Sequence, residues 1–282
     1  MTKLLITGAS GMLGYDVCKL FSKQKDYQIF PFSHKELDIT DIDLLERYLS
    51  DISPDVVINC AAYTKVDLCE EKRELAFKIN RDGPYNLARL CSDLDVFLVH
   101  ISTDYVFSGT KKRPYKEEDT TYPINVYGAS KLAGERKILE TFSEYLIIRT
   151  SWLFGINGPN FIKTILGLAH KLDTLKVVDD QRGRPTYTKD LAVGIKWLLE
   201  QGARGVFHVT NDGECSWYEL AKFAIREKKI DVEVIPVNST QFKRPAKRPS
   251  YSVLDTSKFK STCKNNLRHW KEAVKDYLGY LD

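Results

Sequence analysis

A glycine-rich turn near the start of the chain constrains the possible folds more than any other feature. Residues 3–7 read as a short apolar strand, and a helical pattern follows through residue 21. Gly8, Gly11 and Gly14 stand between them. In such a turn the first glycine allows a tight bend, the second lets a ligand approach the backbone, and the third lets the helix pack on the strand. Backbone amides there bind phosphate, so the segment predicts a dinucleotide site. A purely structural turn is the alternative.

Strand-like and helical segments alternate along much of the chain. The segments expected to be strands are residues 3–7, 27–32, 55–59, 96–101, 145–149 and 205–209. This alternation predicts a Rossmann-type α/β fold, in which helices cover both faces of a doubly wound parallel sheet. The rhythm changes after residue 150. The expected NAD(P)-binding Rossmann domain covers 1–150, with 185–210 returning to it. The expected substrate-binding part is a smaller C-terminal α/β lobe formed by 151–184 and 211–282.

The end of the second predicted strand bears on the choice of cofactor. An NAD-selective site usually has an acidic residue here, which takes the ribose 2′-hydroxyl. This chain has Ser33, His34 and Lys35 instead, a set that suits a 2′-phosphate. The sequence therefore favours NADPH, although a solvated loop is an equal alternative and NADH stays possible. Asp38 and Ile39 are expected beside the adenine.

Small and polar residues follow two later strands, at the edge where open α/β sheets bind ligands. They are Ala61, Ala62, Tyr63 and Thr64 after the third strand, and Ser102, Thr103 and Asp104 after the fourth. Small residues let a flat cofactor pass close to the sheet, and the polar ones are expected to contact ligands. Asn80, in the helical segment 70–91, is a further cofactor candidate, with a surface or capping role as the alternative.

Tyr127 and Lys131 are four residues apart in a segment of strong helix formers, which puts both side chains on one helix face. Asn125 is expected to cap that helix. An ordinary Tyr, with a pKa of about 10, is a slow acid at neutral pH, but an ammonium one turn away lowers that pKa. Tyr127 would then exchange protons near pH 7, as carbonyl reduction requires. An exposed helix face is the alternative.

Composition argues against several other classes of protein. The net charge of +4 over 282 residues is too small to indicate general nucleic-acid binding. The six cysteines form no CxxC pair and are expected to be reduced, as in a cytoplasmic protein. No apolar run approaches the ~20 residues of a membrane span, and we read no signal peptide before the first strand. We expect a cytoplasmic protein with neither nucleic acid nor a membrane as its partner.

A cationic segment with prolines lies near the C-terminus. Residues 243–249 hold four cations, among them Arg248, and their prolines exclude a helix interior. Arginine matches the geometry of phosphate, so the segment is a candidate clamp for a diphosphate, with a solvated loop as an equal alternative. Arg184, in the polar loop 179–186, is a second candidate for binding substrate.

Longer motifs give a more specific indication. They are STDYVFSG at 102–109, PINVYGASKLAGE at 123–135, RTSW at 149–152, DQRGRPT at 180–186, and Arg248-Pro249 followed by Ser252 and Leu254. Together they resemble the dTDP-4-dehydrorhamnose reductases, a family of extended short-chain dehydrogenase/reductases. The resemblance covers nearly the whole chain.

The resemblance implies reduction of the 4-keto group of dTDP-4-dehydro-6-deoxy-L-mannose (dTDP-6-deoxy-L-lyxo-4-hexulose) to dTDP-L-rhamnose by NADPH or NADH, for cell-envelope polysaccharides. Tyr127 would donate the proton, Lys131 would hold the nicotinamide ribose, and Thr103 would hydrogen-bond the substrate carbonyl. Asp104 and Trp152 would contact the sugar. The residues implied to line the cofactor are Gly11, Met12, Leu13, Asp38, Ile39, Ala62, Tyr63 and Thr64.

Two other functions stay open at this point. One is a related reductase or epimerase that acts on another nucleotide sugar, against which Thr103 followed by Asp104 argues. The other is a non-catalytic subunit, like the regulatory subunit of methionine adenosyltransferase, which binds the cofactor as a structural ligand. The joint presence of Thr103, Tyr127 and Lys131 argues against that second function.

Some members of the resembled family form a dimer bridged by Mg²⁺, which carboxylates of both subunits hold. The resemblance aligns Asp16 with one ligand but Lys189 with another, and an ammonium offers no lone pair to a cation. Asp190 stands one residue further along the helix, about 100° from the required face. We therefore expect no bridging metal, and a monomer or at most a weak dimer. If the alignment slips by one residue, Asp190 would serve.

Overall fold

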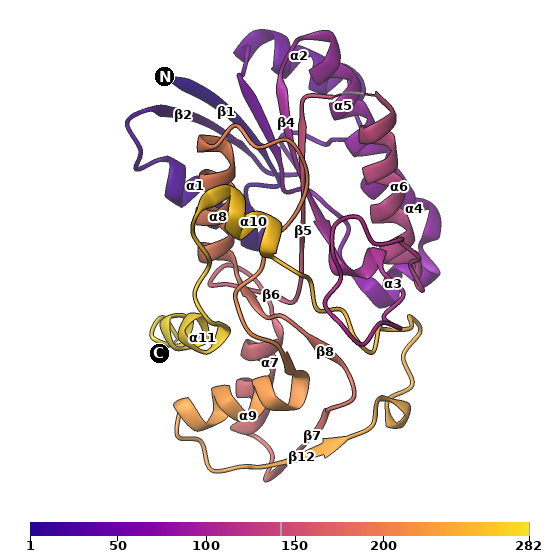
Figure 1. The fold of residues 1–282 in the computed structure, drawn as a ribbon, viewed down its shortest axis with the longest axis vertical. Coiled ribbons are helices and arrows are strands. Elements are labelled where there is room, and N and C mark those ends of the chain that lie inside the picture. The colour runs from indigo at the N-terminus through magenta and orange to yellow at the C-terminus, as the bar shows by residue number, and fades with distance from the viewer. Residues whose placement is uncertain (142, 282) are drawn as a thin grey trace.

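Six parallel strands form one twisted sheet in the computed structural model, which describes residues 1–141 and 143–281 (Figure 1). Residues 142 and 282 fall in the predicted ranges 1–150 and 211–282 and lie outside the described residues. The strands are β1 (Thr2–Thr7), β2 (Tyr27–Phe32), β3 (Val56–Asn59), β4 (Phe97–Thr103), β5 (Tyr145–Thr150) and β10 (Gly205–His208). Across the sheet they run in the order β10-β5-β4-β3-β1-β2, and every neighbouring pair is parallel. The predicted doubly wound parallel sheet is thus confirmed.

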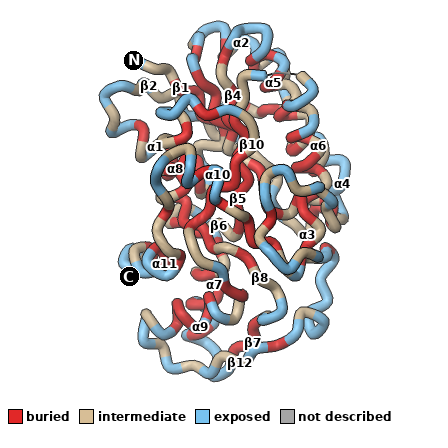
Figure 2. Tube along the Cα trace, viewed as in Figure 1, coloured by how far each residue is buried: buried red, intermediate tan, exposed pale blue. Residues whose placement is uncertain are grey.

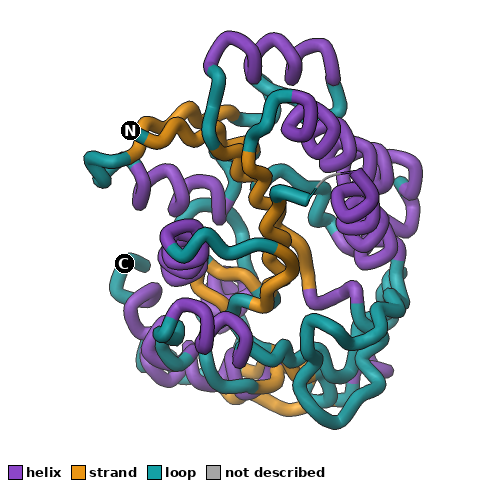
Figure 3. The backbone as a smooth tube through the Cα atoms, turned by 45° about the horizontal axis from the view of Figure 1, so that its top comes forward, coloured by secondary structure: helices purple, strands orange, loops and turns teal. Residues whose placement is uncertain are grey.

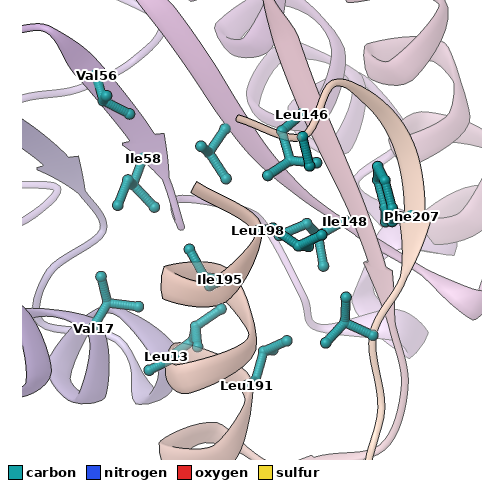
Figure 4. Close-up of a cluster of buried hydrophobic side chains, with 14 of the residues drawn as sticks. Leu13, Val17, Val56, Ile58, Leu146, Ile148, Leu191, Ile195, Leu198 and Phe207 are labelled. Atoms are coloured by element: carbon teal, nitrogen blue, oxygen red, sulfur yellow. The ribbon is translucent and has the colours of Figure 1, made fainter. Parts of the chain in front are cut away.

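Helices cover both faces of this sheet. One face carries α1 (Met12–Phe21) and α8 (Thr188–Glu200), and the other carries α2 (Ile42–Ile52), α5 (Gly83–Asp93) and α6 (Val126–Thr141). Figure 4 shows Leu13 and Val17 of α1 and Ile195 of α8 on the same side of the sheet as Ile58 of β3, with Leu191 of α8 in the same buried cluster. These side chains recur at helical spacing, so each helix buries one apolar stripe against the sheet. The layers place the carboxyl ends of β1, β3 and β4 side by side.

The link from β3 to α5 is divided into more pieces than the helical segment 70–91 predicted from the sequence. It consists of α3 (Val66–Glu71), α4 (Arg73–Phe77) and one π-helical turn (Lys78–Asp82), which runs directly into α5. Pro84 lies in the first turn of α5, a position that tolerates proline. The chain stays helical through Gly83-Pro84.

A smaller lobe lies below the sheet in Figure 1 and has a separate core. Its elements are α7 (Phe161–Ala169), β7 (Thr174–Val178), α9 (Trp217–Glu227), β12 (Glu233–Val237) and α11 (Trp270–Leu278). Strands β7 and β12 pair in parallel, and α7 and α9 pack against each other beside them. Helix α9 begins with a capping box, in which Ser216 and Glu219 each accept the other's backbone N–H. Figure 2 shows buried segments in both the sheet domain and the lobe, and Figure 3 shows helices on either side of the large sheet.

Short strand pairs connect the sheet domain with the lobe. Strands β6 (Leu153–Phe154) and β9 (Thr186–Tyr187) pair in parallel, while β8 (Arg182–Gly183) and β11 (Cys215–Ser216) pair antiparallel. Helix α8 and strand β10 lie on the large sheet. So does α10 (Ser257–Cys263), through Phe259, although the sequence assigned all of 211–282 to the lobe. The aromatic ring of Phe259 is fully buried in the core of the sheet domain, which explains this difference.

The charged segment 110–122 is partly buried. Tyr115 is 1% exposed, and its backbone pairs with that of Leu254 in a parallel bridge. Asp119 ties the exposed part together by accepting from Lys111 and Arg113. Among the described residues, no helix combines the length and the apolarity that a membrane span needs.

Candidate active site

The glycine turn forms a phosphate-sized cradle at the carboxyl end of β1. Gly8 has φ +66° and lies so close to the backbone of Ala61 that a side chain would collide with it. Gly14 packs equally tightly on the carbonyl of Gly8. Helix α1 begins at Met12 with neither a side-chain cap nor an acidic residue in its first turn, as far as the structure is described. Its first amides therefore suit an anion, and the cradle fits a pyrophosphate.

The end of β2 contains an acidic residue that the sequence analysis missed. The Ser33 N–H and hydroxyl both donate to the carboxylate of Glu36, at 2.8 and 2.6 Å. These bonds lower the pKa of Glu36. His34 lies 3.8 Å from Asp38. Ser33 and Glu36 form the S-x-x-E spacing of a capping box, so a local signal for this contact was available. The cationic set for a 2′-phosphate thus includes a competing carboxylate.

Asn80 of the π-helical turn holds the backbone of Tyr63, in the segment that follows β3. Asn80 accepts from the Tyr63 N–H (2.8 Å) and donates to the Tyr63 carbonyl and the Ser130 hydroxyl, both at 3.0 Å. Both of its amide hydrogens are used within the protein, so Asn80 positions Tyr63 and α6. The sequence suggested that Asn80 contacts the cofactor, but its amide has no donor left for that contact. Ile39 is likewise a core residue, 2% exposed and packed on Gly83.

Helix α6 carries Tyr127 and Lys131 into the site. Asn125 accepts from the Gly128 N–H at 2.7 Å, which confirms the predicted cap. Gly128 lies against the carbonyl of Tyr105, where any larger side chain would collide. This close approach sets the Tyr127 ring edge-on to the Tyr105 ring, with 5.8 Å between centroids. The helix therefore holds Tyr127 directly beside the segment that follows β4.

The predicted effect of Lys131 on Tyr127 is not what the structure shows. Burial raises the pKa of Tyr127, Thr103 opposes this, and the nearby Asp104 adds to it. Lys131 directs its amino nitrogen to the Ile101 carbonyl, at 2.6 Å, so it does not lower that pKa here. The shared helix face was predicted correctly, but burial dominates the pKa of Tyr127 and the Lys131 amino group points to a different partner.

Thr103 and Asp104 form a buried polar pair at the end of β4. The Thr103 hydroxyl donates to one Asp104 oxygen at 3.0 Å and accepts from the Tyr105 N–H at 3.2 Å. The other Asp104 oxygen is buried and has no hydrogen-bond partner within the described residues. Burial raises the pKa of Asp104 to about 7, against the hydroxyls of Ser252 and Thr103. An unpaired buried oxygen of this kind fits the polar hydroxyls of a sugar.

Ser102, predicted to contact the cofactor, turns to a buried ion pair instead. Its hydroxyl donates to the carboxylate of Glu135 on α6. Arg149 of β5 binds the same carboxylate, with its Nη2 2.6 Å from Oε2 and its Nε 3.0 Å from Oε1. The side chains of Glu135 and Arg149 are 1% and 6% exposed. These three residues lie on three different elements, β4, α6 and β5, and no local sequence signal indicates their contact.

The predicted substrate residues lie on the lobe side of the site. Trp152 has φ +48°, a strained value for a bulky residue, and its ring stacks on Trp217 with 3.5 Å between centroids. Arg184 lies 3.2 Å from the Thr256 hydroxyl and 3.8 Å from Asp212. Trp217, which the sequence analysis did not select, thus stacks on the predicted substrate residue Trp152.

Arg248 differs from the predicted diphosphate clamp. Its guanidinium forms a bidentate pair with Asp67 of α3, at 2.6 and 2.7 Å. The Lys247 carbonyl accepts from Asn125 at 2.8 Å. The segment 243–249 is therefore fastened to the sheet domain beside the Tyr127 helix, and Asp67 already neutralises the guanidinium.

We predict that Mg²⁺ does not control oligomeric state, because the relevant carboxylates have other partners. The Thr188 hydroxyl donates to Asp16 at 2.5 Å, Lys189 pairs with Asp276 at 3.0 Å, and Arg268 binds Asp190 at 2.8 and 2.9 Å. Sedimentation velocity with Mg²⁺ and then with a chelator should give the same monomer or weak dimer. A tight dimer that dissociates on chelation would contradict this prediction.

Comparisons with known proteins agree with this geometry. The family model described as "RmlD substrate binding domain" matches residues 1–282. The dTDP-4-dehydrorhamnose reductase of Streptomyces griseus is 41% identical over 98% of this chain and 93% of its own length. The dTDP-4-keto-6-deoxy-D-glucose reductase of Streptomyces niveus is 40% identical over 99% and 97%. The dTDP-4-dehydrorhamnose reductase of Bacillus anthracis, crystallised in complex with NADP, has a TM-score of 0.95 and 40% identity over 99% of both chains. The chain therefore belongs to the RmlD substrate binding domain family, the family of the dTDP-4-dehydrorhamnose reductases.

Proposed function

We propose that this protein reduces the 4-keto group of dTDP-4-dehydro-6-deoxy-L-mannose, with NADPH, to give dTDP-L-rhamnose. One observation carries the proposal: Tyr127, which is partly buried, lies beside the buried Thr103, whose hydroxyl opposes the rise in the pKa of the Tyr127 phenol. The glycine cradle and Ala61 lie at the same edge of the sheet. The relatives named for this activity, and the NADP complex of the Bacillus anthracis protein, support it.

In this proposal Tyr127 supplies the proton for the reduction, with Thr103 and Asp104 beside it. The bound nicotinamide would supply the hydride to the carbonyl carbon. Burial keeps the Tyr127 phenol protonated at neutral pH, because it raises the pKa. Tyr127 then delivers that proton to the carbonyl oxygen as negative charge develops there. Thr103 has a single hydroxyl hydrogen, which points to Asp104 in the cofactor-free protein. In this proposal that hydrogen turns from Asp104 to the substrate oxygen when the sugar binds.

A panel of 4-keto sugars linked to dTDP, UDP and GDP tests the proposal. We expect turnover of NADPH to be fastest with the dTDP-linked L-lyxo sugar, with dTDP-L-rhamnose as the product by mass spectrometry and NMR. The Streptomyces niveus relative is named for a D-glucose-derived 4-keto sugar at similar identity, so that substrate is the second candidate. Binding of NADPH with no turnover of any sugar would instead indicate a non-catalytic subunit.

We predict that NADPH is preferred over NADH. Ser33, His34 and Lys35 offer donors at the end of β2, and a charged phosphate contact is worth about 1–3 kcal/mol. The preference in kcat/KM should be at least ~5-fold. Because Glu36 occupies the Ser33 donors, Glu36→Gln should enlarge the preference by removing a repelling charge. Equal or better kcat/KM with NADH in the wild type would refute the prediction.

A further inference from the structure

A chain of four buried side chains runs beneath the site, from β1 to α6. Thr7 donates to the Asn59 Oδ1 at 2.7 Å, and the Asn59 Nδ2 lies 3.0 Å from the His100 Nδ1. The His100 Nε2 lies 3.2 Å from the Lys131 Nζ. Thr7 and His100 are 0% exposed, Asn59 is 1% exposed and Lys131 is 2% exposed. Water therefore does not take the place of any of these partners.

A backbone amide fixes the direction of every hydrogen bond in this chain. The Ala61 N–H lies 3.1 Å from the Asn59 Oδ1. A backbone N–H can only donate, so this side of the Asn59 amide must be its oxygen, and the NH₂ group must face His100. The His100 Nδ1 therefore accepts. A neutral imidazole that accepts at Nδ1 carries its hydrogen at Nε2, which makes Nε2 a donor toward Lys131.

An ammonium at Lys131 would set N–H against N–H in this arrangement. An amine satisfies it, since the nitrogen lone pair accepts from His100 and one N–H donates to the Ile101 carbonyl at 2.6 Å. We infer that the cofactor-free protein gives up the Lys131 proton at mildly alkaline pH, that a hydrogen bond from His100 then holds the neutral amine, and that Lys131 takes up a proton again when it turns toward the bound dinucleotide. His100 and Asn59 are thus positioning residues for Lys131.

The groups around Lys131 favour the neutral amine at mildly alkaline pH. Burial lowers the pKa of Lys131 to about 8, opposed by Glu135 on the same helix and by Cys60 at the end of β3. Burial and Lys131 together keep the pKa of His100 well below its ordinary value, so the imidazole is neutral. Arg149 of β5, which packs against this region, pairs with Glu135 and so reduces the influence of Glu135 on Lys131.

The Lys131 amino group is expected to change its hydrogen-bond partner when NADPH binds, a step that rests on the proposed function. When the anionic dinucleotide binds, the Lys131 lone pair takes a proton from solvent, and the hydrogen bond from His100 Nε2 breaks. The ammonium then donates to the nicotinamide ribose. Since the pKa of Lys131 is higher in the complex than in the cofactor-free protein, binding takes up a proton between those two pKa values. NADPH affinity should therefore fall as the pH rises above about 8, by up to ~10-fold per pH unit.

Calorimetry measures this proton directly. NADPH is titrated into the protein at pH 7.0 to 9.5, in pairs of buffers that differ in ionisation enthalpy. We expect uptake to grow from near zero to ~1 proton per NADPH bound across this range. Lys131→Met should abolish it. Thr7→Val removes one donor to Asn59 but leaves the Ala61 N–H, which orients the Asn59 amide, so this variant should keep the proton uptake. Binding without uptake in the wild type, or uptake that survives in Lys131→Met, overturns the inference.

Asn59→Asp exchanges the donor and acceptor roles between residue 59, His100 and Lys131 while keeping the shape of the side chain. The new carboxylate still accepts from Ala61 and Thr7, and it now also accepts from His100 Nδ1–H, so Nε2 becomes an acceptor for a Lys131 ammonium. Proton uptake should fall below ~0.2 per NADPH. Uptake that stays at the wild-type level in this variant also overturns the inference.

NMR of ¹⁵Nζ-labelled lysine separates this inference from the proposed function, because it needs no NADPH. The signal that Lys131→Met removes should titrate near pH 8 in the wild type and at least one pH unit higher in Asn59→Asp. An ordinary lysine value of about 10.4 in the wild type overturns the inference. A protein that fails to bind NADPH yet shows the titration near 8 would refute the proposed function alone.

Discussion

Tyr127→Phe is expected to lower kcat by ~10²–10⁴-fold while NADPH still binds, because it removes only the proposed proton donor. The ring remains edge-on to Tyr105, so helix α6 keeps its contact with the end of β4. Burial raises the pKa of Tyr127, so the wild-type phenol keeps its proton through neutral pH. The wild-type rate should therefore not fall through loss of that proton until the solution is strongly alkaline.

Tyr105→Phe is the matched control for Tyr127→Phe. It removes a second buried phenol hydroxyl from the same ring pair without removing the proposed donor. We expect it to retain kcat within ~10-fold of the wild type, which is below the typical range for a lost general acid. Steady-state kinetics with the dTDP-linked substrate and fluorescence titration of NADPH provide the two readouts. A Tyr127→Phe variant with more than about a tenth of the wild-type kcat would remove Tyr127 from its proposed role.

The sheet and the cradle were predictable because their signals are local. Gly8, Gly11 and Gly14 lie within seven residues, and a short apolar run predicts each strand of the large sheet. The same is true of the Asn125 cap and of the capping box at Ser216. Such patterns depend on backbone geometry that neighbouring residues determine, so they survive in any tertiary context that forms the element.

The partners of the site residues were not predictable, because the sheet order brings them together. Lys131 meets His100, which lies 31 positions earlier, and Arg248 meets Asp67 across 181 positions. Their pairing depends on which strand ends and loops become neighbours. The expected effect of Lys131 on Tyr127 failed for this reason: helical spacing predicts a shared face, but it does not predict burial or a competing acceptor such as the Ile101 carbonyl.

Glu135→Gln is expected to cost about 3–5 kcal/mol of unfolding free energy, the largest stability effect that we predict. The variant keeps the shape of the side chain but leaves the Arg149 guanidinium buried without its counter-charge. The pair joins α6 to β5 and also takes the Ser102 hydroxyl, so its loss acts directly beneath the helix that carries Tyr127. Chemical denaturation monitored by circular dichroism gives the measurement.

Two further variants show whether the cost comes from the uncompensated charge. Glu140→Gln removes a carboxylate from the same helix, but this residue pairs with Lys137 in solvent, with 61% of its side chain exposed, so its unfolding curve should superimpose on that of the wild type. Replacing both members of the buried pair, by Glu135→Leu with Arg149→Met, should recover much of the loss, because neither charge then remains in the core. If the double variant is less stable than Glu135→Gln, packing of the two side chains matters more than their charges, and the electrostatic explanation is wrong.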